Sequence, residues 1–313
     1  MPRYSNTEDH PLQGLRGFLR WRRTAARVEP KTFPLADNDP SYLLQNRRET
    51  TLTWIGHATF LFQVAGLNIL TDPQFSERAS PVQWLGPRRM VPPGLALGEL
   101  PPIDLVLISH NHYDHLDRGT MRALGRLAAP PRLCLAPLGL RRKLERWGLP
   151  QVLELDWWQS HRCGRLTTHA VPVQHSSVRS GFDRNRTRWC GWYLDAPGQR
   201  FLFAGDSAYS GDFQTIRRRL GPPDLAALPI GAYEPRWFMR HVHATPEEAV
   251  RIHRDLACRQ SVAMHWGTFV LTDEPLDEPP RRLEAARAEA GLGEREFLLL
   301  RHGETVRLEP TVE

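Results

Sequence analysis

The stretch IDLVLISHNHYDH, residues 103–115, decides both the fold class and the chemistry of this chain. Its first six residues form a largely apolar run that is typical of a buried β-strand. Its second half has the pattern H-x-H-x-D-H. In an extended chain alternate side chains share a face, so His110 and His112 can bind one metal ion together. The turn that follows directs Asp114 and His115 toward a second ion, and the pattern therefore predicts a two-metal hydrolase.

Three later apolar segments also lead into residues that can bind a metal ion. The segments span residues 166–173, 200–205 and 261–264. The residues that follow them are His175, Asp206 and His265. An α/β scaffold presents its chemistry at strand ends, because the sheet is rigid and the loop leaves the side chain accessible. We therefore expect these three residues to complete the cluster that the H-x-H-x-D-H segment begins.

The chemistry of the side chains divides the expected ligands between two metal ions. One ion would take the three imidazoles of His110, His112 and His175. The other would take Asp114, His115 and His265. A carboxylate has two oxygens, so Asp206 can bridge both ions, and a hydroxide between them would be the nucleophile. Two zinc ions suit this imidazole-rich set, with manganese or iron as alternatives.

Several segments outside this cluster carry a family resemblance. The tryptophan-rich and Gly-Ala-Tyr-Glu-Pro segments are the most specific of them. The matching segments are 53–59, 70–73, 101–104, 108–117, 154–158, 229–239, 246–249 and 265–268. The pattern resembles the metallo-β-lactamase superfamily and, more narrowly, the N-acylphosphatidylethanolamine-hydrolysing phospholipase D family. The resemblance covers roughly residues 50–280. It implies an α/β (α+β) fold, the αββα sandwich of two packed mixed sheets with outer helices, with the metal ions at one edge.

Residue types alone support only a mixed α and β protein. The chain has 313 residues, is 41% hydrophobic and carries a net charge of +6. We expect a polar lead-in at 1–48 and a hydrolase domain at 49–313. No stretch approaches the roughly 20 apolar residues of a membrane span, and four scattered cysteines show no disulfide framework, which is compatible with a cytoplasmic location. We predict no nucleic-acid partner, and the resemblance implies a homodimer.

The lead-in contains a basic amphipathic segment. Its cationic residues are Arg16, Arg20, Arg22, Arg23 and Arg27, and its apolar residues are Leu15, Phe18, Leu19 and Trp21. Such a segment can lie on an anionic phospholipid surface, which would place the protein peripherally on the inner membrane surface. The alternative is a solvated arginine-rich helix that covers part of the core.

Local patterns predict several further elements. We expect strands at 51–54, 60–64 and 297–300, and a surface loop over the proline-rich residues 87–102. A helix is expected over 118–127, with Asp117 as its N-cap. Thr245 is expected to begin another helix, because proline and two glutamates follow it.

Other residues are expected near the metal ions. The resemblance implies that Asp72 orients a ligand imidazole, although an Asp-Pro pair can also simply begin a turn. His57 either lines the site or satisfies a buried backbone group. Candidates for substrate contact are Tyr113, Tyr233, Trp237, Phe238 and Met239, of which the last four could form an acyl-chain pocket or simply belong to the core.

His243 matches a histidine that the phospholipase family keeps near the metal-bound phosphate, and His241 competes for that role. Val242 stands where animal members carry glutamine, which puts the substrate head group in doubt. The resemblance implies hydrolysis of N-acylphosphatidylethanolamine, a phospholipase D-type phosphodiesterase reaction in lipid metabolism. Asp114 would hold the nucleophile, and His243 or a metal ion would stabilise the departing oxygen. The alternatives are a lactonase or other ester hydrolase of the same superfamily, and a non-catalytic lipid-binding protein.

Overall fold

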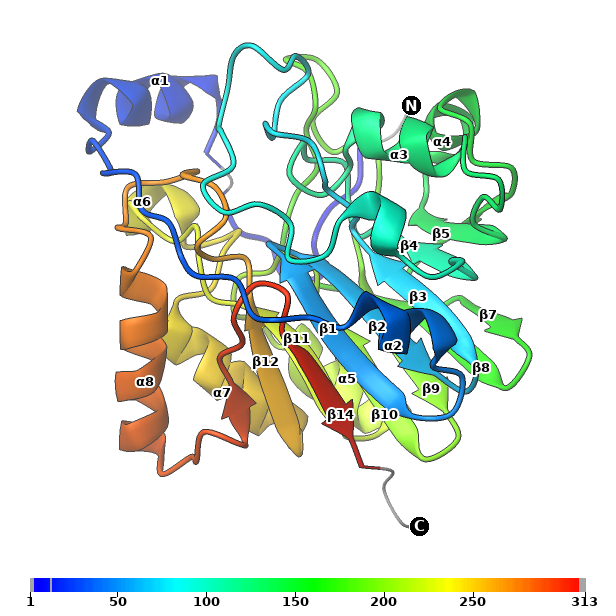
Figure 1. Cartoon of the computed structure of the whole chain (residues 1–313). Helices are drawn as coiled ribbons and strands as arrows, with labels where there is room; N and C mark the ends of the chain where they lie inside the picture. The colour runs from blue at the N-terminus through cyan, green and yellow to red at the C-terminus, as the bar shows by residue number, and fades with distance from the viewer. Residues whose placement is uncertain (1–2, 12, 310–313) are drawn as a thin grey trace.

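Two mixed sheets lie at the centre of the structure, a computed structural model that describes residues 3–11 and 13–309 (Figure 1). The first sheet has the order β14-β1-β2-β3-β4-β5-β6. Its strands are β1 (Thr50–Gly56), β2 (Thr59–Val64), β3 (Leu67–Thr71), β4 (Leu105–Leu107), β5 (Leu133–Pro137), β6 (Val152–Leu155) and β14 (Thr305–Leu308). Neighbours from β14 to β3 pair antiparallel, and neighbours from β3 to β6 pair parallel.

The second sheet repeats this plan with the order β13-β12-β11-β10-β9-β8-β7. Its strands are β7 (Ser160–Cys163), β8 (Leu166–Val171), β9 (Gly191–Ala196), β10 (Gln199–Phe203), β11 (Leu225–Pro229), β12 (Gln260–Met264) and β13 (Phe297–Leu298). Neighbours from β7 to β10 pair antiparallel, and neighbours from β10 to β13 pair parallel. In both sheets the parallel strands end at a common edge, where their loops present side chains to one another.

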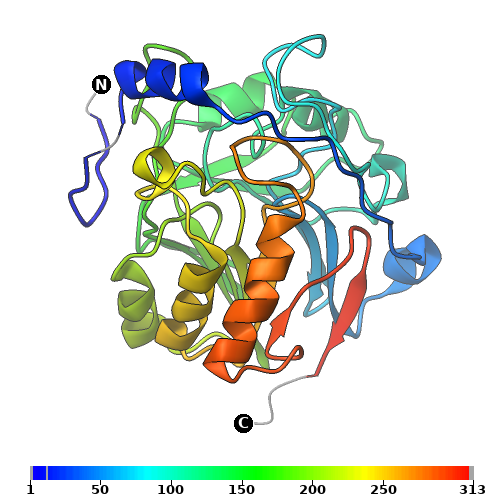
Figure 2. The same ribbon diagram turned by 90° about the vertical axis from the view of Figure 1, so that its left-hand side faces the viewer.

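Helices cover the outer faces of both sheets. The helices are α1 (Leu15–Thr24), α2 (Pro40–Gln45), α3 (Arg118–Leu124), α4 (Arg141–Arg146), α5 (Asp212–Leu220), α6 (Arg236–Met239), α7 (Pro246–Leu256) and α8 (Glu278–Ala290), with a 3₁₀ turn at Leu97–Glu99. Buried residues of α2, α3 and α4 join the apolar cluster on the outer side of the first sheet. Figure 2 shows α5, α7 and α8 side by side on the second sheet. The expected αββα sandwich is confirmed.

Successive side chains of a strand point to opposite faces of its sheet, and in this protein both faces are buried. Phe60 and Phe62 of β2 face the second sheet, where the ring of Phe62 lies 4.6 Å from that of Phe201. Leu61 points the other way and packs under the helices of the first sheet. A strand buried on both faces needs apolar residues at successive positions, and β2 has them. The sandwich is therefore held by apolar residues between the sheets and under the helices of each sheet.

The local predictions hold for most elements. Asp117 caps α3 by accepting hydrogen bonds from the backbone of Gly119 and Thr120, as expected. The helix ends at Leu124 rather than at residue 127, because the chain turns at Gly125. Thr245 and Glu248 form the capping box of α7.

The segment 87–102, predicted as a surface loop, is irregular and mostly exposed or half-buried, but part of it is packed against the core. The loop buries Val91 and Leu95 completely or nearly so, because it folds back over the edge of the sandwich. In this segment the backbone of Gly94 donates to Ile55, and that of Met90 donates to Thr268. The proline and glycine content identifies an irregular segment correctly but does not distinguish a surface loop from a packed one.

The lead-in packs on the rest of the chain. Trp21 of α1 is buried, stacks on Phe238 of α6 at 5.3 Å between ring centroids, and donates from its indole nitrogen to Asp273. Within residues 3–11 and 13–309, the helices all fall short of the length and apolar character needed to cross a bilayer.

Candidate metal centre

Loops at one edge of the sandwich bring the predicted ligands together. His110, His112, Asp114 and His115 lie between β4 and α3. His175 follows β8, Asp206 follows β10 and His265 follows β12. His112 and Asp114 are half-buried and the others are buried. The sequence-predicted ligands therefore form one cluster, supplied by both sheets.

A first group consists of three imidazoles and one carboxylate. His112 Nδ1 lies 2.8 Å from His110 Nε2 and 3.2 Å from His175 Nε2. Asp206 Oδ2 lies 3.7 Å from each of those two Nε2 atoms. One donor atom from each residue thus converges on a common point, which is the arrangement that a metal ion requires.

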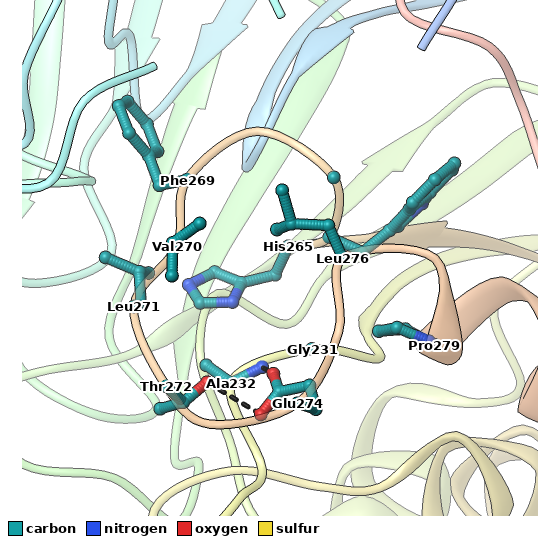
Figure 3. A pocket seen from close by; sticks show the side chains of 12 residues that line it. Gly231, Ala232, His265, Phe269, Val270, Leu271, Thr272, Glu274, Leu276 and Pro279 are labelled. Atoms are coloured by element: carbon teal, nitrogen blue, oxygen red, sulfur yellow. Dashed lines mark hydrogen bonds between the residues drawn. The ribbon is translucent and has the colours of Figure 1, made fainter. Parts of the chain in front are cut away.

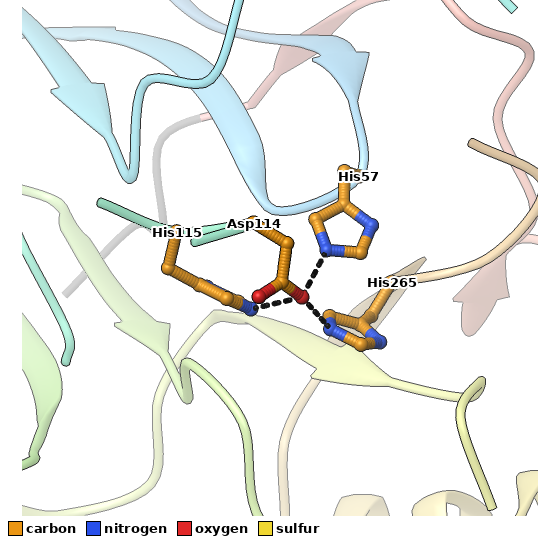
Figure 4. A group of neighbouring side chains, drawn as sticks. All are labelled: His57, Asp114, His115 and His265. Carbon is orange, nitrogen blue, oxygen red and sulfur yellow. Dashed lines mark hydrogen bonds and ion pairs between the residues drawn. The ribbon is translucent and has the colours of Figure 1, made fainter. Parts of the chain in front are cut away.

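A second group lies beside the first, and Figure 4 shows its members. Asp114 Oδ2 lies 2.9 Å from His57 Nε2, 3.3 Å from His265 Nε2 and 3.4 Å from His115 Nε2. Asp114, His115 and His265 are the predicted second set. His57 is an additional potential ligand that the sequence analysis placed only near the site.

Asp206 connects the two groups. Its Oδ2 atom, which faces His110 and His175, also lies 3.0 Å from His115 Nε2. Its Oδ1 atom lies 3.2 Å from His265 Nε2. The carboxylate therefore contacts both groups: Oδ2 lies near imidazoles of each, and Oδ1 lies near His265 of the second.

The imidazoles of the first group can bind a cation because they are neutral and their nitrogen atoms face one another. Burial lowers the pKa of His175 to about 3 and that of His110 well below its ordinary value, so both rings are neutral at pH 7. Neutral rings whose nitrogens face one another at these distances repel unless a proton or a cation lies between them. A metal ion would satisfy every lone pair at once.

The negative charge of the cluster comes from one carboxylate in each group, Asp206 in the first and Asp114 in the second. Burial alone would raise the pKa values of Asp114 and Asp206, but the imidazoles of His115 and His265 hold both well below the ordinary range. In turn, burial alone would lower the pKa of His265, but the Asp206 and Asp114 carboxylates raise it to about 9. Two buried carboxylates require compensating positive charge, and a metal ion can supply it in place of these protons.

Neighbouring side chains hold the ligands in place. Asp72 accepts a hydrogen bond from His115 Nδ1 at 2.7 Å and others from the backbone and hydroxyl of Ser109. The same hydroxyl lies 2.8 Å from His110 Nδ1. The carbonyl oxygen of Val242 lies 2.8 Å from His175 Nδ1. Such contacts fix the ring orientation and the nitrogen that faces the metal.

Sequence reasoning missed Ser109, although its position directly before the motif could have indicated it. Arg179 was missed as well. Its guanidinium donates to the carbonyl groups of Asn111 and Leu116, which lie in and just after the motif. The guanidinium also lies 3.9 Å from the ring centroid of Tyr113, whose hydroxyl donates to the Arg179 carbonyl. Tyr113 therefore lies beside the cluster but is engaged with Arg179.

The ring of His57 lines the site, because its Nε2 atom lies 2.9 Å from Asp114 Oδ2. The backbone carbonyl of His57 accepts a hydrogen bond from the backbone of His265. Its φ of 55° lies in the left-handed region, which is unusual for a residue with a Cβ atom. Such backbone strain persists only where the surroundings fix it, and here it turns the ring into the cluster.

His243 joins the cluster and His241 does not. His243 is buried, and its Nε2 atom lies 4.0 Å from Asp206 Oδ2. Its ring centroid is 5.2 Å from those of His175 and His265. His241 instead stacks on His10, at 4.7 Å between centroids.

The residues expected to form an acyl-chain pocket are buried or contact helices α1 and α8. Tyr233 is fully buried and its hydroxyl donates to Glu278 of α8, so it has no surface open to a substrate. Met239 is buried. Phe238 and Trp237 contact α1, through Trp21 and Arg20 respectively. This run of residues packs helices together in this structure.

A pocket beside His265 is lined instead by the loop that follows this histidine (Figure 3). Apolar side chains of Phe269, Val270, Leu271 and Leu276 line it, together with the ligand His265. The sequence analysis did not select these residues. Their signal is the apolar run that begins directly after the His265-Trp266-Gly267-Thr268 segment.

Comparison with known proteins gives the family. The beta-lactamase superfamily domain matches residues 67–266, more than half of the chain. The chain belongs to this superfamily. It is 39% identical over 264 residues to N-acyl-phosphatidylethanolamine-hydrolyzing phospholipase D 1 of Caenorhabditis elegans, covering 80% of this chain and 74% of the relative. The predicted recognition of the narrower phospholipase D family is thereby confirmed.

Two other relatives extend this comparison. The mitochondrial N-acyl-phosphatidylethanolamine-hydrolyzing phospholipase D of Saccharomyces cerevisiae is 36% identical over 250 residues, covering 78% of this chain and 53% of the yeast protein. An uncharacterised protein of Mycobacterium tuberculosis is 43% identical over 258 residues, covering 81% of this chain and 68% of that protein.

Solved structures share the fold. The metallo hydrolase Igni18 of Ignicoccus hospitalis has a TM-score of 0.62 at 24% identity, covering 84% of this chain and 99% of its own. An isothiocyanate hydrolase from Delia radicum gut bacteria has a TM-score of 0.65 at 21% identity, covering 83% of this chain and 99% of its own. The protein is a metallo-hydrolase of the β-lactamase superfamily whose His/Asp cluster can hold metal ions.

Proposed function

We propose that this protein is a phospholipase D-type phosphodiesterase that hydrolyses N-acylphosphatidylethanolamine or a related lipid, with two zinc ions as its cofactors. The observation that carries the proposal is the carboxylate of Asp206, which lies between two groups of ligands in a chain related to N-acylphosphatidylethanolamine-hydrolysing enzymes. The products would be an N-acylethanolamine and phosphatidic acid.

The ligand chemistry supports zinc. The first ion would be held by His110, His112 and His175, the second by Asp114, His115 and His265, with Asp206 shared. Neutral imidazoles with a few carboxylates are typical ligands of Zn²⁺, whereas Mg²⁺ and Ca²⁺ prefer sites made of oxygen ligands. Bound at these positions, the ions would activate water and polarise the phosphodiester.

The chain's own residues would orient the reacting groups. Asp114 is fixed by the imidazole of His57, so its carboxylate can hold one position beside the ligands. Burial lowers the pKa of His243 well below its ordinary value, so the ring is neutral at pH 7. With its proton on Nε2, which faces Asp206, His243 can donate a hydrogen bond to the departing oxygen of the substrate.

Exposed apolar side chains at one end of the molecule support contact with a lipid surface. Phe18 and Leu19 of α1 are exposed, while Trp21 anchors the helix. Trp84 is 76% exposed and Phe182 is 86% exposed. Their loops, residues 76–90 and 176–188, lie with α1 at the upper end of both overall views (Figures 1 and 2). We infer that these tips insert into a bilayer surface while the arginines of α1 contact anionic head groups.

The test of the activity compares two substrate classes. Zinc-loaded protein is assayed on N-acylphosphatidylethanolamine vesicles and on a panel of lactones and carboxylic esters. We expect release of N-acylethanolamine and phosphatidic acid at a rate well above that for any lactone. Efficient lactone hydrolysis without cleavage of the phospholipid would instead place the protein among the carbonyl hydrolases.

Asp206→Asn tests the shared ligand. The substitution should lower metal content and turnover together, because the amide offers one neutral acceptor in place of a shared carboxylate. Asp195→Asn is the matched control, since Asp195 is exposed on β9 and away from the cluster. Turnover that survives Asp206→Asn would refute the bridging role.

A further inference from the structure

Residues 4–10, here called the N-terminal strap, run along the loops that carry the cluster. The backbone of Tyr4 donates to the Asn185 carbonyl, in the loop that follows His175. The side chain of Thr7 donates to Asp212, which begins α5 just after the Asp206 loop. His10 stacks on His241, the residue before Val242. The strap therefore contacts three segments that are far apart in sequence and that each hold part of the centre.

Asn6 makes the most direct of these contacts. Its side-chain nitrogen donates to the His175 carbonyl at 2.9 Å, and its side-chain oxygen accepts from the His175 backbone nitrogen at 3.1 Å. The same oxygen accepts from the indole nitrogen of Trp189 at 3.0 Å. One amide side chain thus satisfies both backbone groups of a ligand residue, in the manner of a neighbouring strand.

His175 needs such support because it lies beyond the regular sheet. Strand β8 ends at Val171. Beyond it, Gln174 forms an isolated bridge with Ala208, and no strand pairing continues at His175. Asn6 takes the place of the missing strand partner at His175 itself. The ring is then held from its other side by the Val242 carbonyl, on the segment where His10 stacks.

We propose that Asn6 is a positioning residue for the metal ion held by His110, His112 and His175. The inference rests on the metal-binding part of the proposed function and is independent of the substrate. Removing residues that orient metal ligands typically costs about 10- to 100-fold in metal affinity. Loss of the Asn6 side chain should have an effect of this size on one ion only.

The test is a spectroscopic titration of metal-free full-length protein with Co²⁺. His175→Ala is the reference, because the visible absorption that disappears in this variant identifies the ion of the first group. In Asn6→Ala we expect that absorption to need about 10-fold or more additional Co²⁺. The absorption of the ion beside Asp114, His115 and His265 should keep its titration midpoint.

Two matched controls separate positioning from general loosening. Thr7→Val removes a strap contact to Asp212 but leaves Asn6 and His175 untouched. Lys31→Ala removes an exposed ion pair between the lead-in and Asp277. Neither variant should move either Co²⁺ midpoint. A double variant, Asn6→Ala with His175→Ala, should bind Co²⁺ as His175→Ala does, because Asn6 acts through that ligand.

The outcomes distinguish a failure of the metal-ligand assignment from a failure of the positioning role of Asn6. If His175→Ala changes no absorption, the metal assignment fails and the strap proposal with it. If His175→Ala removes one absorption but Asn6→Ala shifts nothing, the metal assignment stands and the role of Asn6 is refuted. Equal weakening of both ions in Asn6→Ala, or an equal effect of Thr7→Val, would also overturn it, since either result means that the strap stabilises the fold in general.

Discussion

The carboxylate of Asp72 lies 2.7 Å from His115 Nδ1, on the side of the ring that faces away from the cluster. Both side chains are completely buried. The contact leaves His115 Nε2 free to face Asp114 and Asp206, at 3.4 and 3.0 Å. Asp72, in the loop after β3, would thus fix which nitrogen of His115 faces a bound metal ion.

Asp72→Asn should therefore weaken metal binding without removing a ligand. An amide accepts the His115 proton less strongly than a carboxylate, so the ring loses its fixed tautomer. We expect metal affinity to fall by about 10- to 100-fold. Competition with a fluorescent zinc chelator measures the change. The exposed Asp195→Asn serves as the control, and equal affinities in both variants would contradict the orienting role.

His243→Gln should lower turnover while both metal ions remain bound. The ring is in the cluster but is not among the proposed ligands, and a hydrogen-bond donor placed at developing negative charge contributes about 100-fold or more to the rate. Steady-state assays with parallel metal analysis measure both quantities.

His241→Gln is the matched control for that variant, because its ring stacks on His10 instead. Near-parental turnover is expected for it. A loss of metal in His243→Gln would instead make this residue a ligand.

Removing the metal ions should make stability fall as the pH rises from about 6.5 to about 9. In the metal-free protein the pKa of His265 is raised from its ordinary value of 6.5 to about 9 by the two carboxylates. Because the folded protein holds this proton more tightly than the unfolded chain, the proton stabilises the folded state fully below pH 6.5. This stabilisation is lost as the pH rises and the His265 ring loses its proton near pH 9. Metal ions replace the proton, so the loaded protein should not show this loss.

Thermal unfolding between pH 6 and 10, with and without metal, checks this prediction. The melting temperature of the metal-free protein should fall across the window and that of the loaded protein should fall less. Parallel curves for the two forms would show that the proton on His265 is unimportant for stability.

Thr245→Ala should destabilise the fold by about 1 kcal/mol, the usual cost of losing an N-cap side chain. Thr245 accepts from the backbone of Glu248, and Glu248 also pairs with Arg236 at 3.0 Å. Urea unfolding measures the free energy. Glu284→Ala, an exposed change on α8, is the control, and equal stability of the two variants would argue against the capping contribution.

The members of the cluster could be predicted from the sequence because their signal is local. His110 to His115 follow one another, and His175, Asp206 and His265 each end an apolar run. The caps Asp117 and Thr245 were predictable for the same reason, since a cap contacts only the next turn of its own helix.

Contacts between distant segments were not predictable in this way. Asn6 reaches His175 across 169 positions, and no periodicity or motif marks it. Tyr233 and Met239 were selected for a substrate pocket because aromatic and apolar residues follow a family motif, yet the same properties suit burial. The position of such a side chain depends on which helix packs over it, which only the assembled fold decides.

The supply of ligands from both sheets has a mechanical consequence. His110 and His112 lie in a loop that follows a strand of the first sheet, whereas His175 and Asp206 lie in loops that follow strands of the second. A bound ion would therefore join the two halves of the sandwich. Neither half retains a full coordination shell by itself. Two polypeptides divided in the connection at residues 156–159, between β6 and β7, should accordingly reassociate more tightly when zinc is added.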